Sequence, residues 1–312
     1  MKFGIIGTGA VGGYYGGLLC RQGFETHFLL HSDYEHVMKN GLFIESKDGD
    51  FALGNVNAYN SPEDMPRCDI VLVALKTTAN DSLASILPHV AKDDSIVVVL
   101  QNGLGVEADV RKVLPGATIL GGLCFLCSNK IGPGHIRHLD FGSVRLGEFR
   151  DDGTAAGITP ALDKVSRAFS QAGIPVDVTE NLGLARWQKL VWNMAFNGVS
   201  VVLSATTREL MDDASSLSLV RDIMREVVEG ARACGYDPGD NFIETMLDVT
   251  GKMVAYSPSM KLDFEAGRPL ETDKIYRAPI MAARAAGFNM LKSEVIARQL
   301  EFLDRRNTRN AF

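Results

Sequence analysis

Three glycines within the first twelve residues constrain the fold of this chain more than any other feature. An apolar segment over residues 2–6 runs into Gly7-Thr8-Gly9-Ala10-Val11-Gly12, and apolar side chains then recur at helical spacing until Gly23. Glycines at this spacing between a strand and a helix are typical of a dinucleotide-binding turn. Gly7 permits the tight turn, Gly9 lets a pyrophosphate approach the backbone, and Gly12 lets helix and strand pack closely. We therefore expect residues 7–12 to hold a dinucleotide; the alternative is a purely structural glycine turn.

Apolar strands alternate with helical segments over the first 179 residues. Such strands predict a mostly parallel, doubly wound sheet of the Rossmann type, covered by helices on both faces. The last strands lie closer together and are separated by turns, which predicts an antiparallel edge. Beyond the first strand, the expected strands are residues 26–30, 69–75, 95–100, 118–122, 135–138, 143–146 and 174–178.

The sequence pattern changes after Thr179. Strand signals almost disappear and long helical patterns follow, over residues 182–203, 217–234, 241–255 and 293–306. The chain therefore divides into an α/β nucleotide domain over residues 1–179 and an all-α domain over residues 180–312, without a flexible linker.

Charge and cysteine content limit the class of protein. Lys and Arg number 32 against 38 Asp and Glu, a net charge of −6, so neither nucleic acid nor an anionic membrane is an expected partner. Any anionic ligand must be held by a few placed cations or by backbone N–H groups. Five cysteines spread over 312 residues do not form a disulfide scaffold and favour a cytoplasmic location. Apolar runs such as residues 95–100 fall far short of the ~20 residues that span a membrane.

The end of the second strand indicates which dinucleotide binds. Sites specific for NAD usually carry an acid ~20 residues after the glycines, where it holds the ribose 2′-OH. Here the corresponding position is His31, followed by Ser32, and Asp33 lies beyond it. The missing acid and two donors for a phosphate favour NADP, used as NADPH, over NAD. The alternative is a turn with no cofactor role.

Three polar residues share one face of the first helix in the second domain. Lys189, Asn193 and Asn197 are spaced i, i+4 and i+8, and so fall within about 80° of arc among apolar neighbours. An unpaired buried amide costs ~1–3 kcal/mol, so these side chains need polar partners. We interpret them as a polar wall that faces the cofactor; the alternatives are a solvated stripe or a hydrogen-bond network between helices.

Further polar residues follow buried strands or come late in the chain. Lys76 and Asn102 each stand just past a strand, where ligands bind in an open parallel sheet. Ser259 and Glu271 lie twelve residues apart in the helical domain. Taken singly, Lys76 and Asn102 are interpreted equally well as ordinary loop residues, and Glu271 is interpreted equally well as a surface charge.

Together these residues resemble the ketopantoate reductase (2-dehydropantoate 2-reductase) family over essentially the whole chain. The resemblance implies NADPH-dependent reduction of ketopantoate to pantoate, a step of pantothenate and coenzyme A biosynthesis. It implies that Lys189 is the general acid and Glu271 its essential partner. It also implies that Asn193, Asn197 and Ser259 hold the 2-oxo acid, while Asn102 and Lys76 lie where nicotinamide, phosphate and substrate meet. It implies as well that Glu271 lies beside both the cofactor and the 2-oxo acid.

Three positions depart from the family pattern. The family often has Arg at the position of His31, and it can carry asparagines where this chain has Thr207 and Tyr256 near the substrate. Alternatives to ketopantoate reduction are therefore a reductase or dehydrogenase of another 2-oxo or hydroxy acid, and a non-catalytic NADP-sensing protein. The expected partner is the small 2-oxo acid; the sequence leaves the oligomeric state open, with a homodimer as the assembly considered.

Several other signals predict structure rather than chemistry. Cys124 and Cys127 form a C-x-x-C with apolar spacers and no accompanying zinc ligands, so no metal site is expected. His135 and His138 flank a strand without a carboxylate cluster and are expected to be structural. The methionines between Met211 and Met290 are expected to fill the core.

Overall fold

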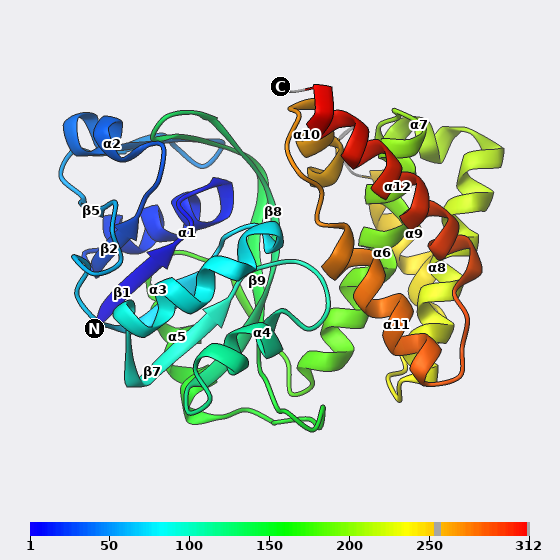
Figure 1. Cartoon of the computed structure of the whole chain (residues 1–312), viewed down its shortest axis with the longest axis horizontal. Coiled ribbons are helices and arrows are strands. Elements are labelled where there is room, and N and C mark those ends of the chain that lie inside the picture. Colours follow the sequence, from blue (N-terminus) through cyan, green and yellow to red (C-terminus); the bar gives the residue numbers. More distant parts are fainter. Residues whose placement is uncertain (253–256, 311–312) are drawn as a thin grey trace. The chain divides into compact units, whose positions relative to one another are not determined.

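Two units make up the structure, a computed structural model that describes residues 1–252 and 257–310, with only the backbone for 308–310. The α/β unit comprises residues 1–101 and 106–182 (Figure 1). The helical unit comprises residues 102–105 and the chain from Gly183 onward. The boundary falls after residue 182 rather than 179. The short loop 102–105 belongs to the helical unit, although its sequence lies inside the predicted nucleotide domain.

One ten-stranded sheet organises the α/β unit, in the order β4-β3-β9-β8-β7-β6-β1-β2-β5, with β10 paired to β9. The run from β5 through β2, β1, β6 and β7 to β8 is parallel, as predicted for a Rossmann-type sheet. The strands are β1 (Lys2–Ile6), β2 (Glu25–Leu29), β3 (Leu42–Ser46), β4 (Phe51–Leu53), β5 (Asn57–Tyr59), β6 (Cys68–Val73), β7 (Ala91–Val99), β8 (Thr118–Gly132), β9 (His135–Glu148) and β10 (Val176–Val178).

The predicted antiparallel edge is wrong in its position. β8 and β9 do form an antiparallel hairpin, but β3 pairs with the outer side of β9 in parallel, and β4 forms the edge beyond it. The segments 135–138 and 143–146 are one strand, because Phe141 (φ 58°) shifts the register without ending the pairing. The strands β3, β4 and β5 were missed, because they are short, partly exposed and lack a continuous apolar run.

Strand residues alternate between two cores on opposite faces of the sheet. In β6, Ile70 and Leu72 join the core under α1 and α5, whereas Val71 and Val73 join the core under α3 and α4. Burial on both faces explains the continuous apolar strands of the sequence. The helices of this unit are α1 (Ala10–Arg21), α2 (Tyr34–Asn40), the 3₁₀ helix η1 (Thr77–Ser82), α3 (Leu83–Val90), α4 (Val106–Val113) and α5 (Pro160–Gln171).

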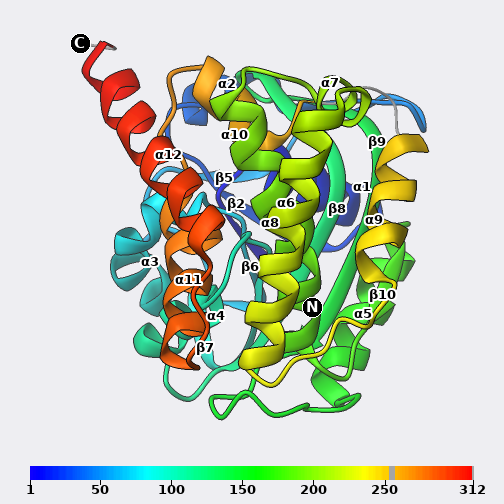
Figure 2. The same ribbon diagram turned by 90° about the vertical axis from the view of Figure 1, so that its right-hand side faces the viewer.

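The helical unit has a core of its own, and the described chain beyond Val178 forms only helices. α8 is contacted by α7, α9, α11 and α12 (Figure 2). Within the described residues, no helix is long and apolar enough to cross a membrane. The helices are α6 (Leu182–Val202), α7 (Thr207–Asp212), α8 (Ala214–Ala233), α9 (Phe242–Lys252), α10 (Ser259–Glu265), the π-helical turn η2 (Asp273–Arg277), α11 (Ala278–Ala285) and α12 (Leu291–Asn310).

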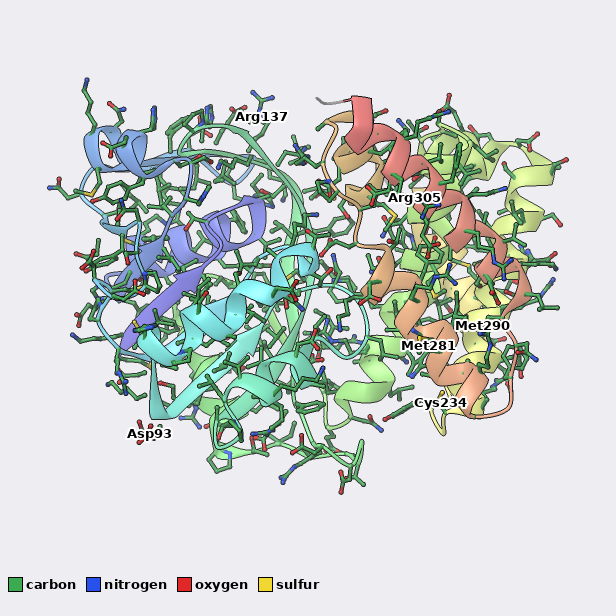
Figure 3. The ribbon with its side chains drawn as sticks, in the orientation of Figure 1. Asp93, Arg137, Cys234, Met281, Met290 and Arg305 are labelled. Carbon is green, nitrogen blue, oxygen red and sulfur yellow. The ribbon has the colours of Figure 1, made fainter. Side chains whose placement is uncertain are left out.

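Figure 3 labels Met281, Met290 and Cys234 of the helical unit, and the two methionines differ in their exposed fraction. Met290 is buried and lies next to Gly230 of α8, as expected for a core methionine. Met281 on α11 is 64% exposed, so the expectation that these methionines fill the core is wrong for it. None of the five cysteines, all of which lie in the described part of the chain, forms a disulfide, and Cys234 directly follows α8.

Candidate active site

The glycine turn has the close approaches that its sequence predicts. Gly7 has φ 94°, and a Cβ there would stand 2.6 Å from the backbone nitrogen of Leu75. A Cβ on Gly12 would lie 2.2 Å from the carbonyl oxygen of Gly7, so any side chain would push α1 away from β1. A Cβ on Gly9 would meet nothing within 4 Å. The backbone of Gly9 is therefore open to a ligand, while Gly7 and Gly12 are closed by packing.

A groove of about 430 Å³ runs from this turn to the end of β2. Its size and its position at the carboxyl ends of parallel strands suit part of a dinucleotide. The Thr8 hydroxyl donates to the carbonyl of Leu29 at 3.2 Å, which ties the turn to β2. The groove is lined by Gly7, Thr8, Gly9, Leu29, Leu30, His31, Ser32, Asp33, Asn60, Pro62, Leu75, Ala79, Ser82, Ile86 and Lys130.

The structure brings some of the expected cofactor residues together and leaves others outside the groove lining. Ala10, Val11 and Gly12 form the first turn of α1 beside the groove. Lys76 is exposed at the start of η1, directly after Leu75, whose backbone contacts Gly7. Lys76 is thus next to the glycine turn without lining the groove.

Asp33 does not occupy the place of a ribose-binding acid. Its side chain is 7% exposed and pairs with the Lys130 ammonium at 2.6 Å, while the backbone N–H of Gly134 donates to the same oxygen at 2.9 Å. Burial alone would raise the pKa of Asp33, but the hydrogen bonds from Lys130, Gly134 and Ser32 outweigh it and lower the pKa. Lys130 was missed in the sequence because it lies some hundred residues from this strand end, on another strand.

The polar face of α6 carries unsatisfied groups in a buried setting. Lys189 is half-buried, Asn193 is 6% exposed and Asn197 is 2% exposed. Among the residues that the structure describes, the Asn193 Nδ2 and the Asn197 Oδ1 have no hydrogen-bond partner. Each unsatisfied atom costs ~1–3 kcal/mol, which a bound polar ligand would recover. For these two atoms the structure shows neither a solvated stripe nor a network between helices.

The loop 102–105 brings Asn102 to the segment that carries Glu271. The backbone N–H of Leu104 donates to the carbonyl of Lys274 at 2.9 Å. Gly103 has φ 103°, and a Cβ there would stand 2.5 Å from the same carbonyl oxygen. Glu271 is buried and lies three residues before Lys274. The loop that carries Asn102 thus contacts the segment that follows Glu271, although some 170 residues separate Asn102 from Glu271 in the sequence.

Tyr276 connects the Glu271 segment to α6. It lies in η2, and its hydroxyl donates to the carbonyl of Met194 on α6. Complete burial raises the pKa of Tyr276 well above its usual value. A Cβ on Gly198 would overlap the Tyr276 hydroxyl, at 1.9 Å, so this glycine lets the two segments approach. The only sequence signal for this contact was Gly198 inside a helix, and such a glycine does not indicate which residue packs against it.

The remaining substrate candidates lie at helix starts in the helical unit. Ser259 is the first residue of α10 and is half-buried. Thr207 is the first residue of α7 and is 2% exposed, directly after Thr206, which with Glu209 forms a capping box. Tyr256 lies outside the described residues.

Comparison with known proteins identifies the family. Residues 3–151 match the family model "Ketopantoate reductase PanE/ApbA", and residues 181–304 match the model of its C-terminal domain. The chain belongs to the ketopantoate reductase family. It is similar to the 2-dehydropantoate 2-reductase of Nostoc sp. (strain PCC 7120), with 51% identity over 306 residues that cover 98% of this chain and 96% of the relative. Members of this family are NADP-dependent oxidoreductases.

Solved structures of the ketopantoate reductase family share the fold. The 2-dehydropantoate 2-reductase of Geobacter metallireducens GS-15 is 40% identical, with a TM-score of 0.91 over 96% of this chain and 99% of that one. A dimeric ketopantoate reductase from Staphylococcus aureus is 18% identical, with a TM-score of 0.82 over 98% and 100% of the two chains. The second similarity concerns the fold alone. The predicted α/β and all-α architecture is thereby confirmed.

Proposed function

We propose that this chain reduces 2-dehydropantoate to pantoate with NADPH, the reduction that pantothenate and coenzyme A biosynthesis requires. The observation that carries the proposal is the α6 face, where the buried Asn193 and Asn197 keep unsatisfied polar atoms beyond Lys189. In a member of the ketopantoate reductase family, a 2-oxo acid is the ligand that this face suits.

The α/β unit holds the cofactor in this proposal. Bound NADPH supplies the hydride. The open backbone of Gly9 and the first turn of α1, over Ala10, Val11 and Gly12, give N–H donors to its pyrophosphate. Gly7 and Thr8 shape the turn, and His31 and Ser32 are exposed at the far end of the groove as donors to a phosphate. Lys76 contributes a positive charge beside the turn.

The helical unit holds the 2-oxo acid and supplies the proton. As the keto carbon is reduced, negative charge grows on its oxygen, and the Lys189 ammonium stabilises and protonates it. Glu271 is the partner that orients the Lys189 ammonium toward the substrate. Asn193, Asn197 and Ser259 bind the carboxylate and hydroxyl of the substrate, and Asn102, fixed beside the Glu271 segment, binds where the two ligands meet.

Replacement of Lys189 by alanine tests the mechanism. General acid catalysis contributes ~10²–10⁴ in rate, so Lys189→Ala is expected to lower kcat by that order while NADPH still binds. Oxidation of NADPH by 2-dehydropantoate measures kcat, and fluorescence titration measures NADPH binding. Lys252→Ala, which removes an exposed lysine paired with Asp248 on α9, is the matched control. Near-normal turnover of Lys189→Ala would remove Lys189 from this role.

The choice of 2-oxo acid is tested by a substrate panel. Thr207 is buried where members of the family can carry asparagine, which changes the donors near the substrate. We expect 2-dehydropantoate to have the highest kcat/KM among branched 2-oxo acids. A higher value for another acid supports the alternative reductase, and tight NADPH binding without any reduction supports the sensor.

We further propose that the chain forms a homodimer, as the relative from Staphylococcus aureus does, and that it is a cytoplasmic enzyme. The cysteine usage and the small-molecule substrate support that location.

A further inference from the structure

Lys130 enters the cofactor groove from the β8–β9 hairpin, far in sequence from the glycine motif. It lines the groove beside the end of β2, together with His31, Ser32 and Asp33. Its side chain is 32% exposed, so it reaches solvent rather than ending inside the protein. A cation therefore stands where the groove meets the strand end that selects between NAD and NADP.

The acid at this end of the groove already has partners for both of its oxygens. Asp33 Oδ2 receives the Lys130 ammonium at 2.6 Å and the Gly134 N–H at 2.9 Å, and Oδ1 accepts from the Ser32 hydroxyl at 3.3 Å. These bonds lower the pKa of Asp33, so the carboxylate stays ionised and paired. A carboxylate engaged in this way is a poor acceptor for a ribose 2′-OH, and its charge no longer repels a phosphate.

Lys130 keeps donors for a ligand. An ammonium has three N–H groups, and the contact with Asp33 uses one of them. The exposed His31 and Ser32 line the same part of the groove. A phosphomonoester, with its charge near −2 and three acceptor oxygens, is the ligand chemistry that such a cluster recognises.

We propose that Lys130 recognises the 2′-phosphate of NADP(H) and so determines the preference for this cofactor, with Asp33 as the positioning residue that fixes its ammonium. The inference rests on the proposed function only for the identity of the cofactor. It assigns the cation of the phosphate site to β8, about a hundred residues from His31 in the sequence.

The test compares two ligands that differ only in the 2′-phosphate. Calorimetry measures binding of 2′-phospho-ADP-ribose and of ADP-ribose to the full chain, so the readout is independent of catalysis. Because a charge-assisted hydrogen bond is lost, Lys130→Gln is expected to lower the affinity for 2′-phospho-ADP-ribose about ten- to a hundredfold. The affinity for ADP-ribose should not change. Lys130→Arg is expected to keep most of the preference. Lys47→Gln, at an exposed lysine paired with Asp48 outside the groove, is the control.

A second variant tests the role given to Asp33. Asp33→Asn keeps an acceptor for Lys130 but removes a negative charge, so we expect binding of 2′-phospho-ADP-ribose at or above the level of the unchanged chain. Binding of ADP-ribose should not change. A fall in ADP-ribose affinity would show that Asp33 itself binds the ribose and would overturn its assignment as a positioning residue.

The remaining outcomes separate the inference from the proposed function. If the unchanged chain prefers 2′-phospho-ADP-ribose and Lys130→Gln does not reduce that preference, Lys130 is not the determinant, while NADPH use stands. If Lys130→Gln weakens both ligands equally, Lys130 only ties the hairpin to β2, and the inference fails. If the unchanged chain binds both ligands equally, both the inference and the NADP preference fail, and ketopantoate reduction with either cofactor is then measured directly.

Discussion

At the scale of single residues, the two asparagines of α6 lower the stability of the folded chain and provide polar atoms for binding the substrate. Asn193 and Asn197 are both buried, yet within the described part of the chain each keeps an atom without a hydrogen bond. The folded chain bears that cost in the absence of substrate, and a bound 2-oxo acid would relieve it.

Replacement of Asn193 by leucine is expected to separate stability from binding. Leucine removes the unsatisfied amide and favours the helix, so the free energy of unfolding should be unchanged or rise by about 1 kcal/mol. The kcat/KM for 2-dehydropantoate should fall about ten- to a hundredfold, because a hydrogen bond to the substrate is lost. Urea unfolding and steady-state kinetics measure the two quantities.

Ser200→Ala is the matched control on the same helix. The Ser200 hydroxyl donates to the carbonyl of Asn197 at 2.9 Å and is therefore satisfied within α6. Its removal should leave kcat/KM nearly unchanged. A large loss of stability in Asn193→Leu with normal kinetics would mean that Asn193 is a structural residue.

At the scale of elements, the loop 102–105 and η2 form one assembly. Gly103 and Leu104 contact the Lys274 carbonyl, and Tyr276 then fastens η2 to α6. This chain of contacts fixes Asn102 and the segment of Glu271 within the helical unit. π-helical turns occur often at functional sites, and this one follows the proposed partner of Lys189.

Two glycines of that loop allow a matched test of the docking. Gly103→Ala places a Cβ 2.5 Å from the Lys274 carbonyl oxygen at φ 103°, whereas Gly105→Ala at φ 76° meets nothing within 4 Å. We expect Gly105→Ala to lower the free energy of unfolding by about 1 kcal/mol through backbone strain alone. Gly103→Ala should lower it by at least about 2 kcal/mol, because the Cβ also meets the carbonyl oxygen. Gly103→Ala should also lower kcat/KM about tenfold by displacing Asn102. Equal effects of the two variants would argue against the docking.

At the scale of the whole molecule, each unit closes its own core. The sheet separates two apolar cores in the α/β unit, and α8 lies among the helices that form a third core in the helical unit.

The chain, which has a mass of 33.9 kDa, is expected to elute as a homodimer. Light scattering coupled to size-exclusion chromatography should give twice that mass at micromolar concentration. The mass of a single chain at every concentration, the highest included, would contradict the prediction.

Much of the architecture was predictable from the sequence. The central parallel strands β1, β6 and β7 contain continuous apolar runs and the helices α1, α6 and α8 are long, so the sequence pattern predicts them. The position of β3 outside β9 was not predictable, because it depends on pairing between residues some ninety positions apart. The spacing of Lys189, Asn193 and Asn197 predicted a shared helix face, but not which atoms on it stay unsatisfied.

The sequence by itself determined the glycine turn, the division into a sheet and a helical part, and the polar face of α6. Each depends on local geometry, such as helix periodicity or the space that a Cβ needs. Only the tertiary structure decided that Lys130 pairs with Asp33 in the cofactor groove and that the loop 102–105 joins the helical unit. Contacts of this kind join segments distant in the chain, and a single sequence carries no local signal for them.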